Sequence, residues 1–192
     1  MAAINIVAIL GFVITLLCCN PISSLIREKG KEENSQDKSY LVLLWIIFGA
    51  AFVARIIAAA VYKGNDTDMN CFLIWSQNVF DEGISKFYLS DSFHDYPPGY
   101  MYILYVVGAI RALFSWTWDS KASIVLTKLP AIIADMFTAY LIFKIASKRL
   151  KKSGAAFLSA VYLFCPMVIL DSAVWGQTDS VFTVFMVLMC YL

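Results

Sequence analysis

The sequence has little charge of either sign. Charged residues make up 15% of the 192 residues, hydrophobic residues make up 60%, and the formal net charge is +1. A soluble domain carries about 25% charged residues, so this composition excludes an ordinary soluble protein and favours a membrane protein. No overall positive field is present to attract nucleic acid, and we expect no nucleic-acid partner.

Metal-binding side chains are also scarce. The sequence contains a single histidine, His94, and five cysteines, of which only Cys71 falls in a polar stretch. This distribution gives neither a disulfide framework nor a zinc site, and we expect no metal and no cofactor. The N-terminus lacks the basic residues that begin a cleaved signal peptide, so a first transmembrane helix is the better interpretation.

Long hydrophobic runs dominate what is present. The runs at 2–19, 40–62 and 122–146 are long enough, or nearly so, to cross a bilayer, which takes about 20 residues. The run at 180–192 has 13 residues and is too short. We therefore expect an all-α polytopic membrane protein and the N-terminal part of a longer chain.

Basic residues in short loops predict the orientation. The richest loops are 20–39 and 147–153, which we place in the cytoplasm. One outer loop, 63–121, then separates the spans, and the short apolar run 99–114 lies at the outer interface or dips into it. If 99–114 crossed instead, the basic loop at 147–153 would lie outside. Residues 1–39 form an extra N-terminal helix and cytoplasmic loop, before a main module at 40–192.

The outer loop contains one long polar insertion at 64–98, with six acidic residues against Lys86. Connections between neighbouring elements are usually only a few residues long, so this insertion points to function. It begins with Asp66 and Asp68 at the start of a helical pattern. Both are N-cap residue types, and one of them could serve only as a cap. A carboxylate in this position could also act as a general base.

Two further groups of polar residues belong to the same side. Asp95 and Tyr96 precede two prolines that form a rigid corner, where they could also contact a sugar; we expect the adjacent His94 to be structural. Lys128 and Asp135 lie seven residues apart on one face of the 122–146 span. Charges inside a membrane usually have a partner or line a cavity. Lys128 either snorkels to the interface or meets a lipid phosphate, and Asp135 serves function or a structural network.

Several of these patterns are shared with known families. Asp68, Trp75, Phe-Tyr at 87–88 and Asp-Tyr-Pro-Pro at 95–98 resemble the first outer loop of the dolichyl-phosphate-glucose-dependent glucosyltransferases of N-glycan assembly. Cys-Pro followed by Trp-Gly-Gln-Thr-Asp-Ser at 175–180 is similar to bacterial membrane proteins related to the GPI-anchor mannosyltransferases. The order of loop, span, basic turn and outer acidic motif also resembles the catalytic subunit of oligosaccharyltransferase.

These likenesses cover about residues 40–192 and identify the chain as resembling the GT-C superfamily, whose members use polyprenyl-phosphate-linked sugars. The resemblance implies a GT-C-like helix bundle with interfacial helices in its outer loop. It also implies inverting transfer of a hexose to a lipid-linked glycan, polysaccharide or protein acceptor. Asp68 would be the catalytic base, and Lys128 would stabilise the leaving phosphate. The residues expected to bind substrate are Asp66, Asp95, Tyr96, Lys128, Asp135, Trp175, Gln177 and Asp179.

Two other functions remain open. A membrane transporter would use Arg55, Lys128 and Asp135 to line a pathway, although the chain lacks the internal repeat that many transporters carry. An inactive scaffold relative is the other alternative. The expected location is a plasma membrane if the protein is bacterial, or the endoplasmic reticulum if it is eukaryotic. The sequence does not distinguish glucose from mannose.

Overall fold

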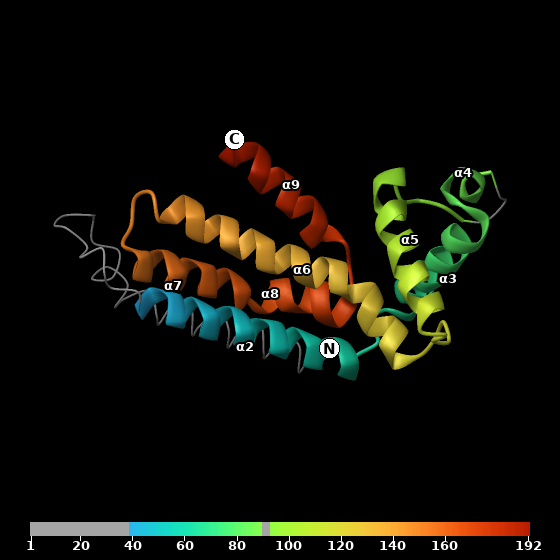
Figure 1. The fold of residues 1–192 in the computed structure, drawn as a ribbon, viewed down its shortest axis with the longest axis horizontal. Coiled ribbons are helices and arrows are strands. Elements are labelled where there is room, and N and C mark those ends of the chain that lie inside the picture. The colour runs from blue at the N-terminus through green and yellow to red at the C-terminus, as the bar shows by residue number, and fades with distance from the viewer. Residues whose placement is uncertain (1–38, 90–92) are drawn as a thin grey trace.

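The computed structural model describes residues 39–89 and 93–192, and within them every regular element is a helix. The predicted helix at 2–19 and nearly all of the loop at 20–39 lie outside the described residues. The elements, shown in Figure 1, are α2 (Ser39–Val61), α3 (Asp66–Glu82), α4 (Ile84–Phe87), α5 (Pro98–Leu113), α6 (Lys121–Ala146), α7 (Lys152–Leu163), α8 (Pro166–Ile169), the π-helix η1 (Leu170–Trp175) and α9 (Asp179–Tyr191).

The long helices α2, α6 and α7 run side by side as a bundle (Figure 1). Small residues are buried where they meet, among them Ala51, Ala139 and Ala155, and they let the helix backbones approach closely. After α7 the chain bends by 52° and continues through α8 and η1. Pro166 begins α8, where its missing N–H costs nothing because the first turn of a helix has no partner for it.

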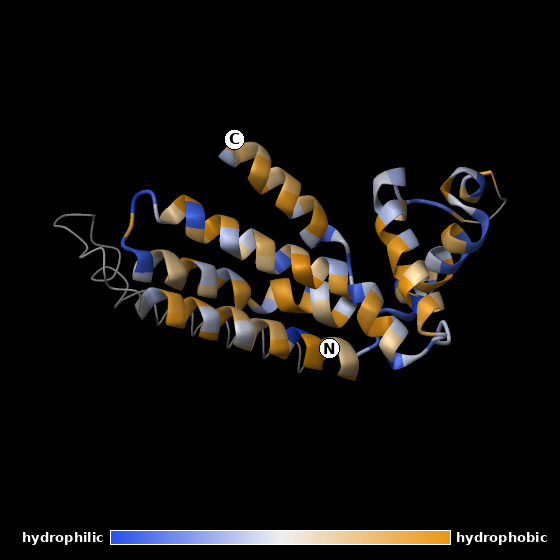
Figure 2. Cartoon of the chain, in the orientation of Figure 1, coloured by the Kyte–Doolittle hydropathy of each residue, from blue (hydrophilic) through white to orange (hydrophobic). Residues whose placement is uncertain are grey.

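The composition of these helices supports the expected membrane protein. Two of them, α2 and α6, are long and apolar enough to cross a membrane, and the bent pair α7 with α8–η1 makes a third if it counts as one span. Figure 2 shows hydrophobic residues along the whole bundle. The chain therefore has the helices that membrane association requires, as its composition predicts.

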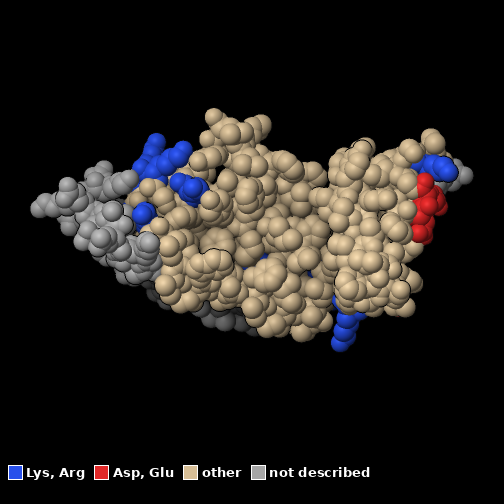
Figure 3. Space-filling model, viewed as in Figure 1, with Lys and Arg blue, Asp and Glu red and all other residues tan. Residues whose placement is uncertain are grey.

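Charge divides the molecule into two ends. Figure 3 shows lysine and arginine gathered at the end where α6 leads into α7, and a patch of acidic residues at the far end, where some basic side chains are also visible. The basic end holds Lys148, Arg149 and Lys151, and the acidic end holds Asp81 and Glu82, all of them exposed. The placing of the basic end in the cytoplasm stays a prediction.

A second unit, made of α3, α4 and α5, sits at the acidic end of the bundle. It has its own aromatic core: Phe72, Trp75, Val79, Phe87, Tyr100, Met101 and Leu104. Arg111 of α5 is buried in the unit and donates to the carbonyl of Leu73, at 3.3 Å, and to Ser76 and Gln77 of α3. These hydrogen bonds from the buried guanidinium join α5 to α3. Helix α5 packs chiefly on α3, at the end of the bundle.

The position of α5 fits the expectation that residues 99–114 stay at one membrane face. In Figure 1, α5 runs across the end of the bundle instead of along it. At 16 residues it is also too short for a straight span. Its place relative to a bilayer stays a prediction.

We predict that Asp119 and Ser153 face opposite sides of the membrane. Asp119 is exposed just before α6, and Ser153 is exposed just after the turn that follows it. In a variant without native cysteines, Asp119→Cys should react with a membrane-impermeant maleimide added outside intact cells. Ser153→Cys should react only after the cells are opened. Labelling of position 119 only in opened cells would refute the single outer loop.

Candidate functional site

Asp68 lies at the junction of the bundle and the α3–α5 unit. Its Oδ2 accepts hydrogen bonds from Trp175 Nε1 at 2.9 Å and from Gln177 Nε2 at 2.7 Å, residues 107 and 109 positions further along the chain. The side chain is half-buried, and no hydrogen bond within residues 39–89 and 93–192 occupies its Oδ1. The turn therefore fixes one carboxylate oxygen, and the other has no hydrogen-bond partner among the described residues.

The turn that follows η1 brings Trp175 and Gln177 to this position. Gly176 adopts the left-handed conformation with φ 88°, which glycine tolerates best. The N–H groups of Gly176 and Gln177 both donate to the carbonyl of Asp171, at 2.9 and 3.0 Å. This reversal, which we call the Trp175–Gln177 turn, directs both side chains back toward α3. Single π-helical turns of this kind occur often at functional sites.

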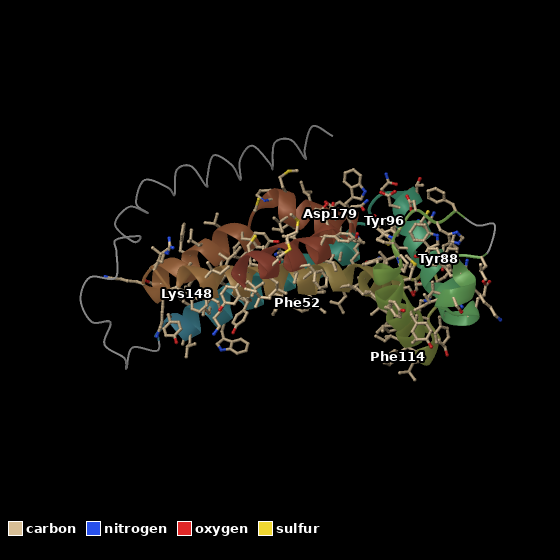
Figure 4. All side chains as sticks on the ribbon, turned by 90° about the horizontal axis from the view of Figure 1, so that it is seen from above. Phe52, Tyr88, Tyr96, Phe114, Lys148 and Asp179 are labelled. Atoms are coloured by element: carbon tan, nitrogen blue, oxygen red, sulfur yellow. The ribbon has the colours of Figure 1, made fainter. Side chains whose placement is uncertain are left out.

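Tyr96 extends the same group of side chains. Its hydroxyl donates to Gln177 Oε1 at 3.3 Å, and its ring packs on Phe72 and Trp75, with centroids 5.3 and 5.6 Å away. Figure 4 shows Tyr96 and Asp179 close together at the junction. Tyr88 secures the corner by donating to the carbonyl of Tyr96 at 2.9 Å.

The carboxylates of the site influence the ionisation of the same neighbouring groups. Burial is the main cause that raises the pKa of Tyr96, and the charges of Asp179, Asp95 and Asp68 raise it further. Burial also raises the pKa of the Cys71 thiol, with smaller contributions from Asp95 and Asp68. Three carboxylates thus surround one phenol, and both Asp95 and Asp179 are exposed to solvent.

Asp66 has a different environment from Asp68. Its side chain is 80% exposed and pairs with Lys63 at 2.8 Å. The cap of α3 is Asn65, whose Oδ1 accepts from the N–H groups of Thr67 and Asp68. Neither aspartate is therefore needed as the cap, and Asp68 alone is engaged by the Trp175–Gln177 turn.

His94 sits among aromatic rings. The imidazole lies 4.3 Å from the ring of Phe87 and 5.7 Å from that of Tyr88, measured between centroids. These contacts belong to the core of the α3–α5 unit. They favour the structural interpretation of His94 over a contact with sugar.

Asp135 is the centre of a buried network. It is fully buried and forms an ion pair with Arg55 of α2, whose Nε lies 3.0 Å from Oδ2. The hydroxyls of Ser172, Ser180 and Tyr162 donate to the same carboxylate at 2.6, 2.6 and 3.3 Å. These partners come from η1, α9 and α7, so one side chain of α6 connects four other elements. Of the two interpretations of Asp135, the structure favours the structural network over contact with substrate.

Lys128 is also fully buried and has no contact with the surface. Its Nζ donates to three backbone carbonyls, those of Tyr62 at 2.7 Å, Ala173 at 3.0 Å and Val174 at 2.9 Å. An ammonium group has three hydrogens. In this arrangement none is left for the lipid phosphate that the resemblance assigned to it, and snorkelling to the interface does not occur either.

The site thus combines predicted residues with partners that the sequence did not suggest. Asp68, Tyr96, Trp175, Gln177 and Asp179 come together as a set from three separate motifs. Asp135 and Lys128 are instead buried in the bundle, where they bind other protein groups. The missed partners of Asp135 are Arg55, Tyr162, Ser172 and Ser180. An arginine inside an apolar run requires an acidic partner and could have identified Arg55, whereas the two serines carry no such signal.

We predict that Asp135→Ala strongly destabilises the protein. The change would leave the guanidinium of Arg55 buried without its counter-charge, and breaking a buried pair in this way costs about 3–5 kcal/mol. Thermal unfolding of the detergent-solubilised protein should show a clear fall in melting temperature. The matched control is Asp119→Ala at an exposed loop position, which should unfold like the wild type. Equal melting temperatures for the two variants would contradict the central role of Asp135.

Comparison with protein-family models, with curated proteins and with solved structures found no match for this chain. A functional argument therefore depends on the residues and on their geometry. The site offers a carboxylate with one fixed and one available oxygen, a phenol, two exposed carboxylates and a half-exposed indole. It lies at one end of an apolar helix bundle.

Proposed function

We propose that the chain belongs to a GT-C-like multi-pass membrane glycosyltransferase. It would transfer a hexose, glucose or mannose, from a polyprenyl-phosphate donor to a lipid-linked glycan, polysaccharide or protein acceptor at the outer face of the membrane. The observation that carries this proposal is the carboxylate of Asp68. Two N–H donors from a distant segment fix its Oδ2, and no hydrogen bond in the described part of the chain occupies its Oδ1.

Asp68 is the proposed general base. Its Oδ1 takes the proton from an acceptor hydroxyl while the hydroxyl oxygen forms a bond with the anomeric carbon. The bond from that carbon to the phosphate oxygen breaks, and polyprenyl phosphate leaves with the electron pair. Attack from the face opposite the phosphate inverts the anomeric configuration. The bonds from Trp175 and Gln177 keep the carboxylate in one orientation, which such a reaction requires.

The neighbouring residues are suited to a sugar. Tyr96, Asp95 and Asp179 offer hydroxyl and carboxylate groups that can bond to sugar hydroxyls. The indole of Trp175 is 50% exposed beside them and presents a flat apolar surface. Binding sites for small ligands commonly combine such a surface with a few fixed polar groups. The apolar bundle beneath would keep the lipid tail of the donor in the same membrane as the site.

The leaving phosphate needs a cation other than Lys128, because the hydrogens of that ammonium group are occupied. Lys63 follows the end of α2 near the site and is partly exposed, with Asp66 as its partner. A surface ion pair of this kind is weak, so Lys63 can exchange Asp66 for a phosphate. We assign Lys63 this role in the proposed reaction.

The transporter alternative loses its main support in this arrangement. Arg55, Lys128 and Asp135 were the charges that would line a pathway. All three are buried and bind protein groups: Arg55 pairs with Asp135, and Lys128 binds backbone carbonyls. A pathway lined by these residues would first have to break the contacts that connect α2, α6 and η1.

The proposal predicts that Asp68→Asn abolishes transfer and leaves membrane insertion intact. Membranes that contain the full-length protein would be supplied with polyprenyl-phosphate-linked radiolabelled hexoses. Loss of a general base should lower the rate about 10²–10⁴-fold, because asparagine can accept the bonds from Trp175 and Gln177 but cannot take the proton.

The control is Asp119→Asn, which removes an exposed carboxylate of the same loop and should transfer at the wild-type rate. Transfer by Asp68→Asn at the wild-type rate would exclude Asp68 as the base. An absence of transfer by well-folded wild-type protein with every donor would favour an inactive relative.

A further inference from the structure

The three carbonyls that Lys128 binds belong to two separate segments of the chain. Tyr62 stands just beyond the C-terminal end of α2, and Ala173 and Val174 precede Trp175 at the C-terminal end of η1. The C-terminal ends of helices leave carbonyls without partners and carry partial negative charge. One buried ammonium group therefore joins two helix ends that would otherwise expose unpaired carbonyls to each other.

The stem of Lys128 packs directly under the Trp175–Gln177 turn. A Cβ placed on Gly176 would lie 3.0 Å from Lys128 Cε and 2.6 Å from the Cε of Met69, the residue after Asp68. The left-handed backbone therefore favours glycine at position 176, and a side chain there would press on the side chains of Met69 and Lys128. The turn packs against the side chain of Lys128 and against Met69 of α3.

A second close contact fixes the other side of the turn. A Cβ placed on Gly64 would lie 2.1 Å from the carbonyl oxygen of Trp175. The short link between α2 and α3 thus touches the turn, and Lys128 anchors the start of that link through Tyr62. The backbone of Trp175 is confined between Gly64 and Lys128.

We propose that Lys128 is a positioning residue for Asp68. Its ammonium group fixes the backbone of the Trp175–Gln177 turn, so that Trp175 Nε1 and Gln177 Nε2 both reach Asp68 Oδ2. Lys128 acts through the turn and touches no substrate. The effect on catalysis rests on the proposed function above, whereas the effect on the turn does not.

Hydrogen exchange tests the structural half of this proposal without any substrate. The N–H groups of Gly176 and Gln177 bond to Asp171 only while the turn is formed. In the full-length protein in lipid nanodiscs, Lys128→Met should speed exchange of the peptide covering 171–178 by roughly tenfold or more, because charge-assisted hydrogen bonds are lost. The control Lys121→Met removes an exposed lysine of the same helix and should leave exchange unchanged.

A second variant covers the case in which Lys128→Met fails to insert. Gly176→Ala disturbs the same turn from above, through its positive φ and its contacts with Met69 and Lys128, and it should speed exchange of the same peptide. Wild-type exchange in a folded Lys128→Met protein, or in Gly176→Ala where only that variant inserts, would overturn the proposal.

Transfer kinetics test the catalytic half. If Lys128 acts through Asp68, Lys128→Met should lower kcat by at least about tenfold and leave the KM for the donor unchanged. It should cause no further loss in an Asp68→Asn background, because residues that act as a unit are not additive. A raised donor KM with unchanged exchange would instead mean that Lys128 binds the donor phosphate directly, and would overturn the proposal.

The two halves can fail separately. If the wild type shows no Asp68-dependent transfer, the proposed function is wrong, and the catalytic role of Lys128 is wrong with it. The exchange experiment still decides whether Lys128 holds the turn. If transfer depends on Asp68 but Lys128→Met transfers at the wild-type rate, only the positioning role is refuted.

Discussion

The buried ion pair between Arg55 and Asp135 is the interaction on which the arrangement of the helices depends. Both side chains are completely buried, and two unpaired charges in such a place would cost far more than the fold could tolerate. Each therefore requires the other. Because the two residues lie on α2 and α6, the requirement fixes the relative position of these two helices. The hydroxyls of Tyr162, Ser172 and Ser180 add α7, η1 and α9 to the same centre.

This centre also determines where the candidate site is built. Ser172 and Ser180 lie on either side of the Trp175–Gln177 turn, and both donate to Asp135, so the two ends of the segment are attached to α6. Lys128, seven residues before Asp135 on the same helix face, binds the carbonyls that precede Trp175. One face of α6 therefore holds the segment at both ends and in the middle. The side chains of Trp175 and Gln177 extend from this fixed backbone and donate to Asp68.

The sequence predicted the broad outline because apolar runs and charged loops follow directly from the physics of a bilayer. The described helices α2, α5 and α6 match the runs expected at 40–62, 99–114 and 122–146 within a few residues. The meeting of the insertion with the segment at 175–180 also followed from placing both on one side. The partners of Lys128 could not be predicted in this way. They are backbone carbonyls, which every residue has, so no residue type in the sequence marks them. The difference between Asp66 and Asp68 depends on which side of a helix start faces the turn, and neighbouring residue types do not specify that.

The distribution of polar groups follows from the apolar surroundings of the bundle. A charge placed among apolar helices is tolerated when it is paired, and in the described bundle Arg55, Asp135 and Lys128 each bind protein groups inside. Carboxylates that are to accept protons or bind hydroxyls must instead lie where water and polar ligands reach them. Asp68, Asp95 and Asp179 lie at the end of the bundle, where the α3–α5 unit adds Tyr96 and an aromatic core. The inner charges thus fix the backbone of the bundle, whereas Asp68, Asp95 and Asp179 lie outside this buried network, at the end where the proposed reaction would take place.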